Sequence, residues 1–210
     1  MKPWGPREDC YKWPYYFTHT PERTRATEEL ARSYADLADE IITRHGKSVA
    51  LIGMESLDEI LLRKVHGYMA HPNRARIFCS REYNASQMVS ILRGLQALLT
   101  SRYHACVLSM AAHVPQLAIG HDLRLKTIYQ ELGLFEDFFI EPNGQDLYER
   151  LRPRVEWLLR DPAWVRDALR RGHEKHQSDA QRNCTLLRDF VQEHGLVPVS
   201  SDAIPYLVTA

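Results

Sequence analysis

Short apolar runs alternate with amphipathic stretches along the first two thirds of the chain. In the amphipathic stretches, apolar residues recur every three or four positions, which predicts helices with one buried face. Leu30, Tyr34, Leu37 and Ile41 form one such stripe, which ends at Gly46. Five runs are too short for helices and predict buried strands: residues 49–52, 76–79, 97–100, 117–119 and 138–140.

Strands that alternate with helices at this spacing predict βαβ units and a parallel sheet covered on both faces. The expected fold class is therefore α/β, a Rossmann-like parallel sheet flanked by helices with a helical C-terminal region. Residues 1–20, rich in proline and aromatic residues, predict an arm that lies over the domain. Residues 21–145 form the expected α/β domain, and the helical stripes of residues 146–210 are expected to pack on it.

Composition narrows the class of protein. The chain has 210 residues, of which 44% are hydrophobic, and its 27 basic and 27 acidic side chains cancel. Such a balance provides no general attraction to nucleic acid or to an anionic membrane. No apolar run approaches the roughly 20 residues of a membrane span, and the polar N-terminus lacks a signal peptide's apolar core. Four widely spaced cysteines indicate free thiols, and hence a cytoplasmic protein.

The turns that follow the predicted strands are the places to look for a binding site, because open parallel sheets bind ligands at the carboxyl ends of their strands. The turn after residues 97–100 carries Ser101, Arg102 and His104 at the start of a helix. Free backbone N–H groups favour an anion there, and Arg102 adds a planar fork for a carboxylate or phosphate. His104 is able to transfer protons near neutral pH. A surface arginine and a histidine that caps the turn are the simpler interpretation.

The next turn adds His121, Asp122, Arg124 and Lys126. Asp122 also fits the N-cap of the following helix, and Arg124 and Lys126 also fit its solvated face. The chain contains no GxGxxG motif, P-loop or GxSxG elbow. Its 10 histidines show no convincing metal-ligand spacing, so we expect no metal and no cofactor.

The stretch from residue 88 to residue 134 resembles the hallmark segment of polysaccharide pyruvyltransferases. That family carries an "sRlHa" turn after a strand, a "gvP" turn, a "yDxK" motif and a helix ending in "lGl". Here residues 101–105 read SRYHA, residues 113–115 read HVP, residues 121–124 read HDLR and residues 132–134 read LGL. Lys2-Pro3-Trp4 resembles the "RPW" that ends the first strand of the family's C-terminal domain. Lys2, His121 and Arg124 depart from the usual arginine, aromatic residue and lysine.

The resemblance implies the transfer of pyruvate from phosphoenolpyruvate to two hydroxyls of a sugar, as a ketal, in cell-surface polysaccharide biosynthesis. Family members resemble GT-B glycosyltransferases, which have two Rossmann-like domains. This chain would correspond to the donor-binding C-terminal half, without most of that domain's first strand. A truncated gene product, a separate chain that supplies the N-terminal domain, and a divergent stand-alone domain all stay open. An exposed sheet edge would favour a homo-oligomer.

The implied site roles follow the matched positions. Arg102 would bind the donor anion and His104 would act as general acid or base. The substrate-binding set would comprise Ser101, Lys2, His121, Asp122, Arg124 and Lys126, with phosphoenolpyruvate and a glycan acceptor as partners. Two alternatives remain: a nucleotide-sugar glycosyltransferase-like domain, with Glu141 as a candidate for holding a ribose, and a non-catalytic domain that binds a sugar or a partner protein.

Overall fold

The computed structural model describes residues 21–55, 58–120, 122–142 and 146–195. The predicted N-terminal arm lies outside the described residues. The strands are β1 (Val49–Gly53), β2 (Ala75–Cys79), β3 (Leu98–Thr100), β4 (Gln116–Ile119) and β5 (Phe139–Ile140). The helices are α2 (Pro21–His45), α3 (Asp58–Tyr68), α4 (Ala85–Arg93), α5 (Tyr103–Met110), α6 (Leu123–Glu131), α7 (Phe135–Phe138), α8 (Leu147–Leu159) and α9 (Ala163–Glu193), with the short 3-10 helix η2 (Pro72–Arg74) before β2.

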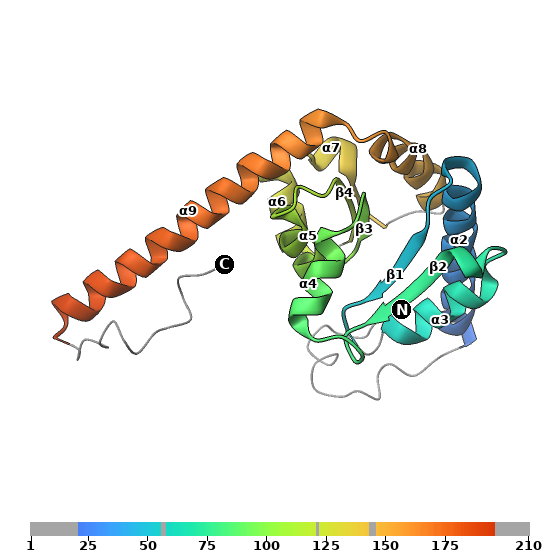
Figure 1. Cartoon of the computed structure of the whole chain (residues 1–210), viewed down its shortest axis with the longest axis horizontal. Helices are drawn as coiled ribbons and strands as arrows, with labels where there is room; N and C mark the ends of the chain where they lie inside the picture. The colour runs from blue at the N-terminus through green and yellow to red at the C-terminus, as the bar shows by residue number, and fades with distance from the viewer. Residues whose placement is uncertain (1–20, 56–57, 121, 143–145, 196–210) are drawn as a thin grey trace.

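All five predicted strands are present, each within one residue of its predicted ends. Every strand pair is parallel, and helices flank the strands (Figure 1). The described strands nevertheless form two sheets, β1–β2 and β3–β4–β5, where the alternation predicts a single sheet. Strand β1 and strand β3 lie on opposite sides of an apolar cavity that residues of both strands line. The predicted α/β class is thus confirmed, and the predicted continuity of the sheet is wrong for the described residues.

The helix ends follow local chemistry. Asn84 caps α4, accepting a hydrogen bond from the backbone N–H of Gln87 at 3.0 Å, while the Gln87 side chain accepts one from Asn84 N at 2.9 Å. Such a reciprocal pair satisfies two backbone donors that a helix start leaves free. Asp122 caps α6 as the sequence predicts. Gly46 follows α2 with φ of +63°, a left-handed conformation that costs glycine little.

The main hydrophobic core surrounds β4. All four residues of β4 are buried, and its apolar side chains belong to a core cluster that includes Leu125 of α6, Leu151 of α8 and Leu169 of α9. Burying one such leucine contributes about 1.5–3 kcal/mol. A second cluster joins the inner face of α2 to Val65 of α3. Strands and helices therefore pack together in the core, and this packing fixes the turns at the carboxyl ends of the strands.

The C-terminal helix α9 has two different halves. Its first turns bury Val165, Ala168 and Leu169, whereas residues 171–195 include no buried residue. Figure 1 shows this second part extending away from the rest of the molecule. Leu186, Leu187 and Phe190 are more than half exposed. None of the helices in the described ranges is long and apolar enough to cross a membrane.

Candidate anion-binding site

Arg102 lies where β3 ends and α5 begins. It is the N-cap residue of α5, with an extended backbone, and its own N–H donates to Thr100 Oγ1 at 2.9 Å. The Thr100 side chain is almost fully buried, so this hydrogen bond holds the turn against the core. The sequence therefore places a guanidinium group beside the backbone N–H groups at the start of a helix, where the helix dipole also favours an anion.

Two carboxylates that follow β1 in the chain contact Arg102. Arg102 Nη1 lies 2.8 Å from Glu55 Oε1, and Arg102 Nη2 donates a hydrogen bond to Asp58 Oδ1. Glu55 follows β1, and Asp58 begins α3. The Glu55 side chain is 58% exposed and that of Asp58 only 22%. The structure thus holds Arg102 by one rather enclosed carboxylate and one that solvent reaches.

Asp58 is fixed from its own side of the site as well. Its Oδ2 accepts hydrogen bonds from the backbone N–H groups of Met54, at 3.1 Å, and Glu55, at 3.0 Å. This turn lies close to Gly53, where a Cβ would stand 3.4 Å from Asp58 Cβ and 3.0 Å from Leu62 Cδ1. The absence of a side chain at Gly53 thus leaves room for α3 to begin against the end of β1.

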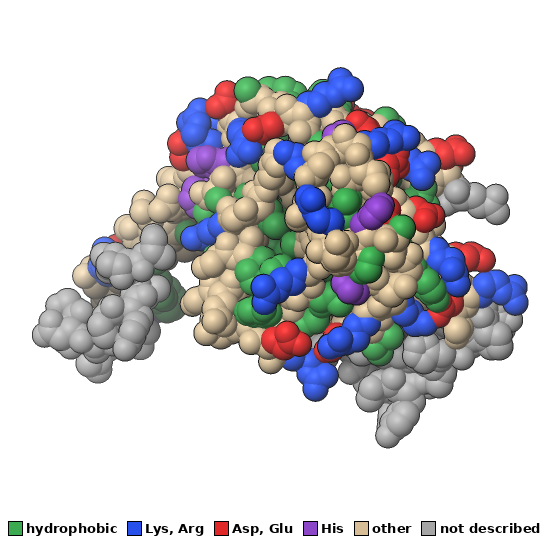
Figure 2. Space-filling view, turned by 45° about the vertical axis from the view of Figure 1, so that its right-hand side comes forward, with side chains coloured by type: hydrophobic (Ala, Val, Ile, Leu, Met, Phe, Trp, Pro, Cys, Tyr) green, Lys and Arg blue, Asp and Glu red, His purple; other side chains and the backbone are tan. Residues whose placement is uncertain are grey.

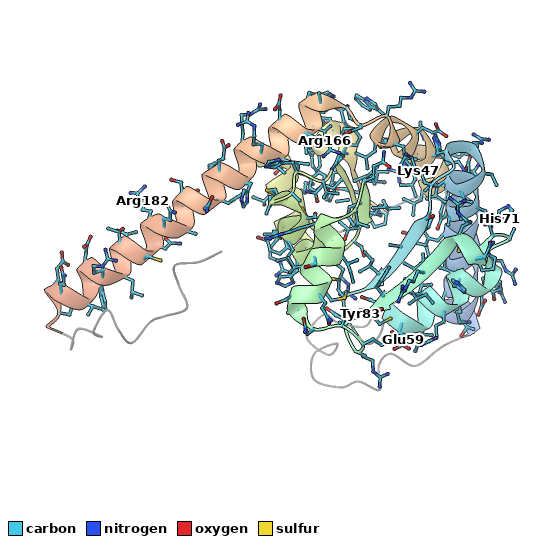
Figure 3. The ribbon with its side chains drawn as sticks, in the orientation of Figure 1. Lys47, Glu59, His71, Tyr83, Arg166 and Arg182 are labelled. Atoms are coloured by element: carbon cyan, nitrogen blue, oxygen red, sulfur yellow. The ribbon has the colours of Figure 1, made fainter. Side chains whose placement is uncertain are left out.

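Neither Asp58 nor Glu55 appears among the residues that the sequence selects for the site. Glu55 lies in one of the turns that the carboxyl-end rule identifies, but nothing local in the sequence couples that turn to Arg102. The signal available was the rule itself, which brings the ends of neighbouring parallel strands to one edge. In Figure 3 the labelled residues Glu59, on α3, and Tyr83 mark this edge, and Lys47 marks the opposite end of β1.

The acidic neighbours stabilise the charged form of Arg102. Desolvation alone opposes the charged form, but the hydrogen bonds and charges of Asp58 and then Glu55 outweigh it and raise the pKa of Arg102 above its ordinary value. The guanidinium is therefore a permanent cation at the mouth of the site.

His104 and Ser101 lie on either side of this arginine in the chain. Both are exposed, and His104 is the second residue of α5. The ring of His104 contacts that of Tyr103 edge to face, with 5.7 Å between ring centroids. The imidazole is therefore accessible to a ligand bound at the start of α5.

Tyr103 connects this turn to the next one. The guanidinium of Arg124, on α6, lies over the Tyr103 ring at 4.8 Å from its centroid. Arg124 Nη2 also donates to Asp122 Oδ2 at 2.7 Å, and its backbone N–H donates to Asp122 Oδ1 at 2.9 Å. The structure thus brings Arg102, His104 and Arg124 to neighbouring strand ends, while Asp122 caps α6.

Lys126 contacts the end of a different strand. Its Nζ lies 3.0 Å from Glu141 Oε1, after β5, and 5.3 Å from the centroid of the Phe135 ring. Glu141, the candidate for holding a ribose, is thus an ion-pair partner of Lys126. Lys2 and His121, which the sequence also assigns to the site, lie outside the described residues.

The apolar cavity between the two sheets opens beside Arg102. It has a volume of about 790 Å³, and Asp58, Thr100, Ser101 and Arg102 belong to its lining. Over the ranges that the structure describes, no three His, Cys, Asp or Glu side chains are grouped so that they could hold a metal ion. The groups that the structure places at this edge are thus a guanidinium, the backbone N–H groups of a helix start and an accessible imidazole.

Parallel strands whose carboxyl-end turns present a cationic fork at a helix start define an α/β protein with a site suited to a small anion. The family model of polysaccharide pyruvyl transferase matches residues 4–122, more than half of the chain. The chain therefore belongs to the polysaccharide pyruvyl transferase family. Comparison with curated proteins finds no match, and comparison with solved structures finds none.

Proposed function

We propose that this chain is the donor-binding half of a pyruvyltransferase that moves pyruvate from phosphoenolpyruvate to a glycan in cell-surface polysaccharide biosynthesis. The observation that carries the proposal is the Arg102 guanidinium at the end of β3, beside the N-terminus of α5. Phosphoenolpyruvate has a carboxylate and a phosphate, which need a planar cationic fork and helix N–H donors. Family membership supplies the reaction class.

The reaction needs proton transfers as well as anion binding. C3 of phosphoenolpyruvate gains a proton, C2 forms bonds to two sugar oxygens, and the bond between C2 and the phosphate oxygen breaks. The two hydroxyls lose their protons, one of which balances the proton gained by C3 and the other the departing phosphate. His104 is exposed beside Arg102, where it would act as general acid or base.

The remaining residues of the proposed site are assigned to substrate binding. Arg124 lies over Tyr103, next to the start of α5, so it would stabilise the charge of the leaving phosphate. Asp122 would orient Arg124 through their ion pair. Lys126 contacts Glu141 at the end of β5, and in the proposed site it, Ser101, Lys2 and His121 extend the substrate-binding surface.

The proposed two-domain arrangement places the glycan acceptor on a second domain, as in the GT-B architecture. A polypeptide that supplies this domain, or a second copy of this chain, would then complete the acceptor side. In this arrangement the acceptor sugar contacts residues of that second domain.

Calorimetric titration with phosphoenolpyruvate tests the donor site. Arg102→Ala should abolish saturable binding, because it removes the cationic fork. Arg63→Ala is the matched control: Arg63 also contacts a carboxylate, with Nη2 2.6 Å from Glu59 Oε1, but lies along α3. Equal affinity in the Arg102 variant and the wild-type chain would refute the assignment.

His104→Ala separates proton transfer from binding. We expect phosphoenolpyruvate binding to persist and pyruvyl transfer to fall by about 10²–10⁴-fold, the usual contribution of a positioned acid or base. Unchanged turnover would contradict the role. UDP binding without phosphoenolpyruvate binding would favour the nucleotide-sugar glycosyltransferase alternative, and binding of neither ligand would favour the non-catalytic one.

A further inference from the structure

A second groove lies between β2 and α4, separate from the cavity beside Arg102. Its volume is about 440 Å³, which falls within the range of about 300–1,000 Å³ that small-ligand sites occupy. Its lining comes from β2, from the turn that follows β2 and from the first turns of α4, and includes Arg76, Phe78, Tyr83, Ser86, Gln87 and Ser90. Aromatic rings, hydroxyls, an amide and a guanidinium therefore line one space that the proposed donor site does not use.

Two aromatic rings form the apolar part of this groove. The rings of Phe78 and Tyr83 lie 5.5 Å apart between centroids and are inclined by 56°. Both side chains are half-buried, so each ring is partly covered by protein and partly open to a ligand. Aromatic rings bury apolar surface well. The C–H face of a sugar ring provides such a surface, while the sugar hydroxyls project around its edge.

Arg76 supplies a cation that is not committed to a carboxylate. Its guanidinium lies over the Phe78 ring, 5.2 Å from the centroid, and its Nη2 donates to the Tyr83 hydroxyl at 3.3 Å. Within the described ranges Arg76 forms no ion pair, whereas Arg63 on α3 pairs with Glu59. The Arg76 side chain is also exposed. Its planar fork is therefore able to bind the carboxylate of a ligand.

Polar groups of α4 line the other wall of the groove. Gln87 Oε1 accepts a hydrogen bond from the backbone N–H of Asn84, which leaves the Gln87 NH₂ group as a donor. Ser90 Oγ donates to the backbone carbonyl of Ser86 at 2.9 Å and keeps lone pairs that accept. Ser86, Gln87 and Ser90 are all exposed. This wall thus offers both donors and acceptors, as the hydroxyls of a sugar require.

The fold determines which face of β2 the groove uses. Arg76 and Phe78 are two residues apart on β2, so their side chains lie on the same face of the strand. Cys79 lies on the other face: it is in register with Gly53, where a Cβ would stand 3.0 Å from a leucine methyl group of α3. The groove therefore lies on the face of β2 that α3 does not cover. It reaches the carboxyl edge through Tyr83, which follows β2 (Figure 3).

We propose that this groove binds one sugar residue that carries a carboxylate, such as a hexuronate, within the glycan. The sugar ring packs on Phe78 and Tyr83, its carboxylate binds the Arg76 fork, and its hydroxyls bond to α4. Arg76 supplies a single positive charge, so the groove fits one carboxylate and not a polyanion. The choice of a sugar rests on the proposed function, and the bound residue is a different one from the residue that receives pyruvate.

Amide NMR spectra of the full 210-residue chain, titrated separately with methyl β-D-glucuronide and methyl β-D-glucoside, test the groove. The two probes share a pyranose ring and differ only in a carboxylate in place of a hydroxymethyl group. We expect saturable shifts at residues 76–91, with an affinity about fivefold higher for the glucuronide, the upper end for an exposed ion pair. Tyr83→Ala, which removes one ring, should weaken the binding of both probes.

Arg76→Ala should lower the affinity for the glucuronide to that for the glucoside. Arg81→Ala is the matched control, because Arg81 is also exposed and close after β2 but pairs with Glu59, and it should leave both affinities unchanged. The absence of saturable shifts, equal binding of the two probes, or an unchanged glucuronide affinity in Arg76→Ala would each overturn the proposal. These titrations contain no phosphoenolpyruvate, so failure of the groove and failure of the donor site give separate results.

Discussion

At the scale of single residues, Arg102 is held by carboxylates before any substrate arrives. Asp58 also accepts hydrogen bonds from two backbone N–H groups, so it is part of the turn. Glu55 is largely exposed and contacts the guanidinium through Oε1 and Nη1. A donor carboxylate that binds Arg102 bidentately must take the place of Glu55. Glu55 therefore competes with the proposed ligand.

Glu55→Gln should tighten phosphoenolpyruvate binding by about threefold, since exposed ion pairs contribute roughly 0.2–1 kcal/mol. Calorimetric titration measures the dissociation constant. Glu59→Gln provides the control, because Glu59 pairs with Arg63 one turn further along α3 and should leave the affinity unchanged. Weaker binding in the Glu55 variant would show that Glu55 supports the site instead of competing for it.

The cysteines differ sharply in their surroundings. Burial raises the pKa of Cys106 to about 12, from an ordinary value of 9.0, whereas Cys184 is exposed on α9. At pH 8, iodoacetamide should label Cys184 and leave Cys106 unlabelled until the chain unfolds, because the thiolate is the reactive form. Peptide mapping by mass spectrometry distinguishes the two sites. Rapid labelling of Cys106 in the native chain would contradict its burial.

The same shift has a consequence for stability. Between pH 9 and pH 12 the unfolded chain loses the Cys106 proton while the folded chain retains it. The folded state then binds more protons, so the free energy of unfolding decreases as the pH rises through this window.

At the scale of elements, helix α9 shows that one continuous helix can serve two environments. Leu169 is fully buried in the main core, and Leu187, on the same helix, is 65% exposed. The sequence predicts an apolar stripe in both halves of the helix. Leu186, Leu187 and Phe190 are nevertheless exposed, because their stripe does not pack against the core within the described residues. Burial, and not helix propensity, therefore distinguishes the two halves.

Leu169→Ala should lower the free energy of unfolding by about 2–5 kcal/mol, because it opens a cavity in the core. Leu187→Ala should change it by no more than about 0.5 kcal/mol, since both residues are good helix formers and the site is exposed. Urea denaturation followed by circular dichroism measures both variants. A large loss in Leu187→Ala would mean that the distal half of α9 packs against something.

At the scale of the whole molecule, charge is balanced and dispersed. The 27 basic and 27 acidic side chains cancel, and Figure 2 shows both signs interspersed over one face with apolar side chains between them. The cation at Arg102 is thus a local feature, surrounded by its own acidic partners. Such a surface offers no extended field to a polyanion.

The chain should therefore pass through a heparin column at pH 7.5 and about 150 mM salt, where proteins that neutralise many phosphates are retained. A mutant such as Glu55→Gln should behave the same way, because one charge does not create a basic face. Retention beyond about 300 mM salt would contradict this and would indicate a polyanion site.

Much of this fold could be predicted from local pattern. Apolar runs too short for helices became strands, Asp122 became the N-cap of α6, and Gly46 ended α2, because each depends on neighbours in the chain. The position of Arg102 at a strand end also followed from local order, and the hallmark motif around it lies within the residues that the family model matches.

What the sequence by itself determined, then, is the set of strands, their parallel alternation with helices and the cation at the end of β3. Only the tertiary structure decided that Glu55 and Asp58 meet Arg102, that Lys126 meets Glu141, and that β1 and β3 stand apart. These contacts join residues 15 to 47 positions apart in the chain, and no local pattern encodes which strands become neighbours. Strand order is a property of the packed sheet, so the site that it assembles appears only once the chain has folded.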